Sequence, residues 1–139
     1  MSGGGAILRC YSGLIVAASA HNFNFGSNHR AEALAILKGL EMTIKLGNDP
    51  LQVESDSLNI INLLRSNDPG HWSIKNIIAD IRNIQRSFLQ VQFQHVLREG
   101  NQAADLLANM GVLIENQQIW TDNFPNDLCQ IVQNDTLHC

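Results

Sequence analysis

The amino-acid sequence predicts an α/β domain in which a mixed β-sheet is flanked by α-helices. Two apolar, β-branched stretches near the N-terminus are typical of a hairpin, and later strand-like segments alternate with segments of helical periodicity. The predicted order is β-β-α-β-α-α-β-α, which favours a mixed sheet with helices packed on its faces. A chain of 139 residues, 45% hydrophobic and 16% charged, is long enough for one core.

The first predicted elements are a β-hairpin and a long helix. Strands over Gly5–Tyr11 and Leu14–Phe23 flank a Ser-Gly turn. The segment SNHRAEALAILKGLEMTIKLGNDP then predicts a helix that is ended by Gly47 and Pro50. Its apolar residues recur at helical spacing, at Ala33, Leu37, Leu40 and Ile44.

The middle of the chain alternates strands and helices. We expect strands over Leu51–Ser55 and Leu89–Leu97, and helices over Ser57–Ser66 and Ile74–Phe88. The apolar residues that define these helices are Leu58, Ile60, Ile61, Leu64, Ile74, Ile77, Ile78, Ile81, Ile84 and Phe88.

The C-terminal part begins with one more predicted helix, in the segment EGNQAADLLANMGV, with Asn101 as its N-cap. From Glu115 onward the chain is polar and rich in amides, and Pro125 interrupts it. This composition favours a docked or flexible appendage over a second domain. We therefore expect one domain over residues 1–114 and a C-terminal tail over residues 115–139.

The charge and the cysteine content argue against several classes of protein. A formal net charge of −4 and a pI of about 5.6 argue against a protein that coats nucleic acid by bulk electrostatics, although a local basic stripe can still hold phosphates. The three cysteines, Cys10, Cys129 and Cys139, form no CxxC pair, which argues against a disulfide framework or a zinc site. A reducing compartment is the default expectation.

No segment predicts export or a membrane span. The stretch GLIVAASA resembles the apolar part of a short signal peptide, but the only basic residue before it is Arg9, and Tyr11 and Ser12 interrupt the apolar run. A buried strand accounts for the stretch better. No apolar run approaches the ~20 residues that cross a bilayer. We therefore expect no membrane partner and a cytoplasmic or nuclear location.

Three carboxylates lie where a chemical role competes with a structural one. Glu32 extends the apolar helical line of Ile36 and Leu40, yet it also suits the positive end of the helix dipole. Asp56 follows a predicted strand, where ligands gather in α/β sheets, but it can instead cap the next helix in competition with the neighbouring serines. Asp105 lies one turn into the last helix, where the dipole again gives a structural account.

Three stretches taken together resemble a known family. NHRAEALAILKGL, VESDS and HVLREGNQAADLLA, in this order and separation, are similar to the ribonuclease H type 1 family, and most of all to its plant and retroelement branch, the reverse-transcriptase-like ribonuclease H domain. The resemblance runs from Gly3 to about Val112. It implies a ribonuclease H-like fold, nucleic-acid binding and endonucleolytic hydrolysis of the RNA strand of an RNA/DNA hybrid.

The resemblance also implies a metal site. In this family four acidic residues hold two Mg²⁺ ions, for which Mn²⁺ can substitute, and Glu32, Asp56 and Asp105 match the second, third and fourth acids. Mg²⁺ prefers hard oxygen ligands, and a metal pair ~3.5 to 4 Å apart can activate the attacking water and stabilise the leaving oxygen. Carboxylates supply both the ligand atoms and the negative charge.

The start of the sequence, MSGGGAIL, departs from the family pattern. In the family the first acid lies in an Asp-Gly pair on a first strand, just before the glycine-rich turn with which this sequence begins. The resemblance therefore predicts an N-terminally truncated fold that lacks the central first strand and the metal-bridging acid. Either the hairpin closes directly on the strand Leu51–Ser55, or another segment or a partner chain fills the slot.

Two functions follow from this departure. We expect a hybrid ribonuclease with strongly reduced activity or none. The alternative is a catalytically inactive nucleic-acid-binding or interaction module that comes from a truncated gene.

Further substrate contacts are implied by the resemblance. Asn28, His29 and Arg30 match the stretch before the second acid, where polar side chains approach the minor groove of the hybrid, although helix capping also accounts for them. The family often has a mobile histidine near its last acid. His95 is not assigned that role, because it lies on a predicted strand.

Basic residues on a predicted helix supply another candidate surface. Lys75, Arg82 and Arg86 are spaced seven and four residues apart, which places them on one helical stripe. Such a stripe can meet backbone phosphates or remain a solvated face.

Overall fold

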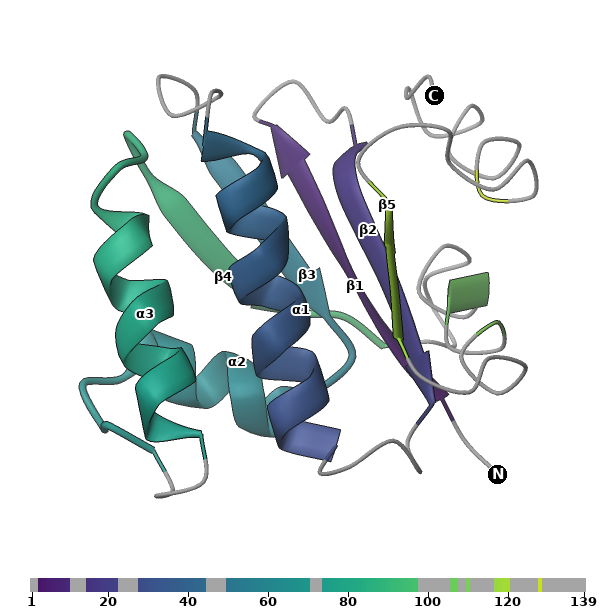
Figure 1. The fold of residues 1–139 in the computed structure, drawn as a ribbon, viewed down its shortest axis with the longest axis horizontal. Helices are drawn as coiled ribbons and strands as arrows, with labels where there is room; N and C mark the ends of the chain where they lie inside the picture. The colour runs from purple at the N-terminus through teal and green to yellow at the C-terminus, as the bar shows by residue number, and fades with distance from the viewer. Residues whose placement is uncertain are drawn as a thin grey trace.

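The computed structural model describes residues 3–10, 15–22, 28–44, 50–70, 74–97, 106–107, 110, 117–120 and 128. Over these residues it contains a five-stranded mixed sheet, with the helices α1, α2 and α3 packed on one face (Figure 1). This arrangement confirms the predicted α/β class. None of the described helices is long and apolar enough to cross a membrane.

The strands follow the order β4-β3-β1-β2-β5 across the sheet. They are β1 (Gly3–Cys10), β2 (Ile15–Asn22), β3 (Leu51–Ser55), β4 (Val91–His95) and β5 (Gln117–Trp120). β3 and β4 run parallel, and every other neighbouring pair in the sheet is antiparallel. The β1–β2 pair is the predicted hairpin.

β1 pairs directly with β3. The register runs from Ala6 opposite Ser55 to Cys10 opposite Leu51. Of the arrangements that the sequence left open, the structure therefore has the one in which the hairpin closes on β3 without an intervening strand.

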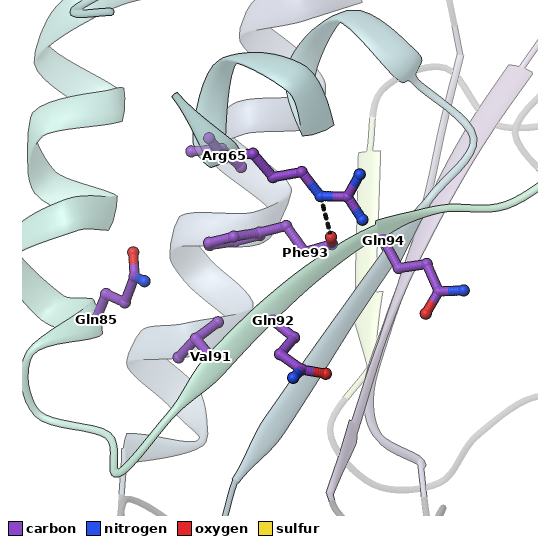
Figure 2. A pocket seen from close by; sticks show the side chains of 7 residues that line it. Arg65, Gln85, Val91, Gln92, Phe93 and Gln94 are labelled. Carbon is purple, nitrogen blue, oxygen red and sulfur yellow. Dashed lines mark hydrogen bonds between the residues drawn. The ribbon is translucent and has the colours of Figure 1, made fainter. Parts of the chain in front are cut away.

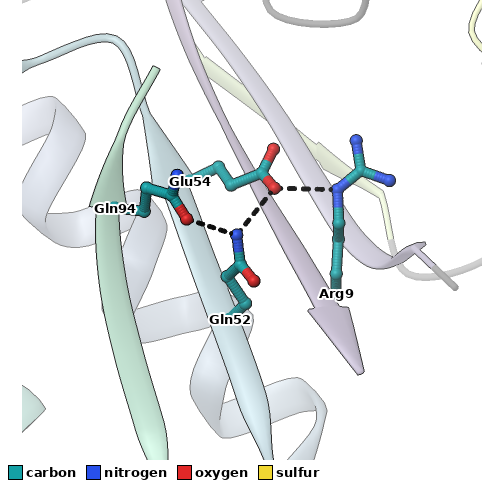
Figure 3. A network of polar contacts seen from close by, with 4 residues as sticks. All are labelled: Arg9, Gln52, Glu54 and Gln94. Carbon is teal, nitrogen blue, oxygen red and sulfur yellow. Dashed lines mark hydrogen bonds and ion pairs between the residues drawn. The ribbon is translucent and has the colours of Figure 1, made fainter. Parts of the chain in front are cut away.

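A polar network reinforces this pairing on the sheet face that carries Ile7, away from the three helices (Figure 3). Arg9 Nε donates to Glu54 Oε2 at 3.0 Å, and the side chains of this ion pair are only 15% and 9% exposed. Gln52 Nε2 donates to the same carboxylate oxygen at 3.1 Å and to Gln94 Oε1 at 2.7 Å. The network therefore links β1, β3 and β4, with an ion pair that is more shielded than a surface pair.

The first helix is shorter than predicted. It ends at Met42, where both the backbone N–H and the hydroxyl of Thr43 donate to the carbonyl oxygens of Gly39 and Leu40, the hydroxyl at 2.8 and 3.4 Å. The prediction that Ile44 belongs to the buried stripe is wrong, because this residue lies beyond the helix end and is 46% exposed. The helices are α1 (Asn28–Met42), α2 (Leu58–Arg65) and α3 (Lys75–Gln85).

Hydrophobic clusters fill both faces of the sheet. The larger cluster lies under α1, α2 and α3, and its fully buried residues include Ala33, Ile36, Leu40, Val53, Ile61, Ile78 and Ile81. The smaller cluster, on the opposite face, contains Ile7, Ile15, Ala18, Ala20, Leu107 and Leu128. The prediction that Leu58 lies on the apolar side of its helix is wrong, because this first residue of α2 is 50% exposed. Among the described residues, the other large apolar side chains that are exposed are Met42 (51%), Ile44 (46%), Leu89 (70%) and Leu97 (64%).

The sequence did not predict β5, which lies in the polar segment that it assigned to a tail. The strand pairs with β2, from Ala18 opposite Trp120 to His21 opposite Gln117. The outer edge of β2 offers backbone donors and acceptors, and these pair with any extended segment whatever the polarity of its side chains.

Gly5 accounts for one of the N-terminal glycines. A Cβ atom at this position would lie 2.6 Å from Leu107 Cβ and 2.8 Å from the carbonyl oxygen of Ser19. Real Cβ atoms do not approach other atoms so closely. Only glycine therefore lets the segment that contains Leu107 pack against β1 as it does here.

Candidate active site

Polar residues gather where the parallel strands β3 and β4 end. Ser55 is the last residue of β3, Asp56 follows it, and His95, the last residue of β4, lies opposite Ser55 in the register. His95 Nε2 lies 3.3 Å from the carbonyl oxygen of Asp56. The carboxyl ends of parallel strands are where α/β folds collect ligands.

Glu32 reaches this edge of the sheet from α1. The spacing with Ile36 and Leu40 predicted that Glu32 extends the apolar line of the helix, and all three residues are buried, with Glu32 only 4% exposed. The Ser55 hydroxyl donates to Glu32 Oε2 at 3.3 Å across 23 residues of sequence. This contact brings two of the sequence-predicted acids, Glu32 and Asp56, to the same edge.

The cap of α2 is Ser57 and not Asp56. The backbone N–H of Ile60 donates to Ser57 Oγ at 3.4 Å, and the N–H of Ser57 donates to Ser55 Oγ at 3.1 Å. The alternative in which Asp56 caps α2 is therefore wrong, because Ser57 is the N-cap. The Asp56 side chain remains half-buried at the strand end.

The strand next to Asp56 carries no carboxylate. Because β1 is antiparallel to β3 with Ala6 opposite Ser55, the residues of β1 at this edge are Gly3, Gly4, Gly5 and Ala6. The third predicted acid, Asp105, lies outside the described residues. Leu107, two positions later, packs against Gly5.

The residues present at this edge fit a divalent cation of the Mg²⁺ kind. Glu32 and Asp56 supply hard carboxylate oxygens, which are the ligands that Mg²⁺ and Mn²⁺ prefer. Within the described ranges, no three His, Cys, Asp or Glu side chains are grouped closely enough to hold a metal ion. A complete site of that kind therefore needs a further acid, for which Asp105 is the sequence candidate.

The predicted minor-groove residues lie at the start of α1. His29 and Arg30 are exposed, and His29 Nε2 lies 3.4 Å from the side-chain amide nitrogen of Asn59 on α2. Asn28 begins the helix, but its side chain is outside the described part of the structure. The exposed residues stand one turn or less from Glu32.

The three residues of the predicted basic stripe differ in how exposed they are. Lys75 and Arg86 are exposed, whereas Arg82 is half-buried. Its Nη2 donates to three carbonyl oxygens at the end of α2 and in the loop that follows: those of Leu63 (3.0 Å), Ser66 (2.9 Å) and Asp68 (2.6 Å). Arg82 therefore has a structural role in holding this loop.

Sequence reasoning missed the role of Ser55. The signal for it is present in the alternation of β3, where Leu51, Val53 and Ser55 share the face toward α1. Its partner Glu32 is visible only in the folded chain.

The fold is that of a ribonuclease H-like domain. The chain belongs to the reverse transcriptase-like family, whose model matches residues 1–111. It is similar to the crystal structure of RNase H1 from the halophilic archaeon Halobacterium salinarum, with 27% sequence identity, a TM-score of 0.57, and coverage of 79% of this chain and 84% of that chain.

A second solved structure shares the fold. It is the N-terminal RNase H domain of a Mycobacterium tuberculosis protein fused to maltose-binding protein, with 20% identity, a TM-score of 0.54, and coverage of 77% of this chain and 96% of that chain. No curated protein matches the sequence.

Proposed function

We propose that this domain binds RNA/DNA hybrids and hydrolyses their RNA strand slowly, with divalent metal ions held by Glu32, Asp56 and Asp105. The observation that carries the proposal is the contact between Ser55 and Glu32, because it joins α1 to the end of β3 beside Asp56. The reverse transcriptase-like match and the likeness to an archaeal RNase H1 support the substrate class.

Each residue of the site has a distinct task in this proposal. Glu32 and Asp56 offer carboxylate oxygens to the metal, and the Ser55 hydroxyl orients the Glu32 carboxylate. Bound metal would supply an activated water and charge stabilisation at the leaving oxygen. His29 and Arg30 are exposed at the start of α1, close to Glu32 in sequence, and are assigned to contacts with the hybrid.

The low rate follows from the composition of β1. This strand lies beside the end of β3 and presents Gly3–Ala6 there, so it adds no carboxylate to Glu32 and Asp56. A metal site with fewer anionic ligands binds divalent cations more weakly and positions them less well. We therefore expect Mn²⁺, the tighter-binding ion of the pair, to support more cleavage than Mg²⁺.

The same feature of β1 favours a second candidate function, a catalytically inactive module that binds hybrids. Such a module should bind an RNA/DNA hybrid with an affinity that falls as salt rises, because the side chains of Lys75, Arg86 and Arg30 are exposed and positively charged. It forms no product with either metal. Filter binding and cleavage measured on the same sample separate the two candidates.

The proposal predicts that Glu32→Gln and Asp56→Asn each abolish metal-dependent cleavage of a labelled RNA/DNA hybrid, because each removes an anionic ligand and keeps the side-chain size. The measurement is product formation on a denaturing gel with Mn²⁺ or Mg²⁺ at high enzyme concentration. Glu41→Gln on α1 and Asp80→Asn on α3 are matched controls, since both residues are exposed. If the Asp56→Asn variant still cleaves the hybrid, the proposed metal site is wrong.

A further inference from the structure

β4 is an outer strand of the sheet, and among the described residues only the side chain of Arg65 bonds to the backbone of its free edge. Its neighbour on one side is β3, and nothing among the described residues pairs with its other edge. Its sequence, VQFQH, contains no lysine, proline or acidic residue. Exposed strand edges in stable proteins are normally blocked by such residues, so this edge is a candidate for pairing with another strand.

The register fixes which backbone groups of β4 point outward. The N–H of Leu51 donates to the carbonyl oxygen of Gln90, and the N–H of Val96 donates to the carbonyl oxygen of Ser55. The backbone N–H and C=O groups of the even-numbered residues 90–96 therefore point toward β3. Backbone groups of consecutive residues in a parallel strand alternate between its two edges. The N–H and C=O groups of Val91, Phe93 and His95 therefore point away from the sheet.

A groove of about 550 Å³ runs along this free edge (Figure 2). It lies between β4, the end of α2 and the end of α3, and Arg65 is the only charged residue among the described residues that line it. Arg65 Nε donates to the carbonyl oxygen of Phe93 at 2.7 Å. Within the described part of the chain, its Nη1 and Nη2 groups have no hydrogen bond.

We propose that this groove binds an extended peptide with an acidic residue, which adds to the sheet as a strand next to β4. The outward N–H groups of Val91, Phe93 and His95 donate to the peptide backbone, as in other strand-addition complexes. The free Nη groups of Arg65 bind the peptide carboxylate, and the glutamines along the groove leave that positive charge uncompensated.

Charge favours an acidic peptide over a second copy of this chain. Arg65 contacts Phe93, the midpoint of β4. A two-fold, antiparallel pairing of β4 with the β4 of another copy would bring two Arg65 guanidinium groups together at the centre of the contact. Like charges in such a position oppose pairing.

The first test is an NMR titration of the ¹⁵N-labelled chain with a capped heptapeptide of alternating valine and threonine that has glutamate at its centre. The amides of Val91, Phe93 and His95 should shift with saturation, whereas those of Gln92 and Gln94, which bond to β3, should shift little. The same peptide with lysine in place of glutamate should bind about five-fold more weakly or worse.

Variants separate the two parts of the contact. Arg65→Gln should lower the affinity for the glutamate peptide about five-fold and leave the affinity for the lysine peptide unchanged or higher. Arg86→Gln, which changes an arginine outside the groove, should alter neither affinity. Val91→Pro should abolish binding, since proline removes an outward N–H that β3 does not use and is tolerated on edge strands.

Two results would overturn the proposal. One is that the native chain and the Arg65→Gln variant each bind the glutamate peptide and the lysine peptide with the same affinity, whether or not the amide signals of β4 shift. The other is shifts of the β4 amides that depend on protein concentration alone, accompanied by a dimer in sedimentation, which would assign the edge to a second copy. Neither result depends on nuclease activity, so a failure here leaves the proposed metal site standing.

Discussion

At the scale of single residues, the proposed metal site depends on Ser55. Its hydroxyl donates to Glu32 on α1 and accepts the N–H of Ser57, the residue that caps α2. The sequence was sufficient to predict that Glu32 faces the core, because helical periodicity depends only on spacing. It was not sufficient to predict the Ser55 contact, since that partner comes from 23 residues away and only the tertiary fold brings it close.

Replacing Ser55 by alanine should lower both stability and metal affinity. The lost hydrogen bonds should reduce the free energy of unfolding by about 0.5–1.5 kcal/mol, and the affinity for Mn²⁺ should fall severalfold because the Glu32 carboxylate is no longer oriented. Urea unfolding and Mn²⁺ titration measure the two effects. Ser66→Ala, which removes a hydroxyl bonded to the carbonyl oxygen of Leu63, is the control that should leave metal affinity unchanged.

Arg82 should matter for stability more than for nucleic-acid binding. Arg82→Gln removes donors from three carbonyl oxygens, so we expect a loss of about 1–2 kcal/mol in the free energy of unfolding. Arg86→Gln should stay within about 0.5 kcal/mol, since that side chain is exposed. Equal stability of the two variants, with hybrid affinity lost only in Arg82→Gln, would show that Arg82 is chiefly a phosphate contact.

At the scale of elements, the sequence was sufficient to predict most helices and strands, but it predicted where they end less accurately. The stripe of α1 was predicted from spacing, but the helix ends at Met42, before the predicted stop at Gly47 and Pro50. β5 could not be predicted, because its strand conformation comes from the free edge of β2 and not from its own polar sequence. The sequence resemblance assigned the glycines at the start of β1 to a turn. In the structure, the close packing of Leu107 against Gly5 accounts for glycine at that position.

Two glycines allow this packing argument to be tested by contrast. Gly5→Ala should destabilise the domain by about 1–3 kcal/mol, because the new methyl group meets the Ser19 carbonyl oxygen and Leu107 Cβ, neither of which can move alone. Gly39→Ala should be nearly neutral, since its tightest contacts are with the methyl groups of the Leu8 side chain at 3.1 and 3.3 Å, with Ala17 Cβ at an ordinary 3.8 Å, and since alanine gains helix propensity. Thermal unfolding measures both, and equal losses would contradict the assigned close approach.

At the scale of the whole molecule, the order of the sheet decides the composition of the site. The sequence predicted a mixed α/β fold with Glu32 and Asp56 near each other, but it left open how the hairpin meets β3. That choice is long-range, and residue patterning does not encode it. The direct β1–β3 pairing places Gly3–Ala6 beside the end of β3, so the proposed site depends on Glu32 and Asp56 with Asp105.

The location of the metal site is tested most directly by Mn²⁺ titration of the ¹⁵N-labelled chain, followed through paramagnetic broadening of its amide signals. We predict that broadening is strongest at Glu32, Ser55, Asp56 and His95 and that Asp56→Asn removes it, because these residues share one edge of the sheet. Broadening that centres instead on the Glu54 network or on Asp80, or that survives Asp56→Asn unchanged, would contradict the assignment of this edge as the metal centre.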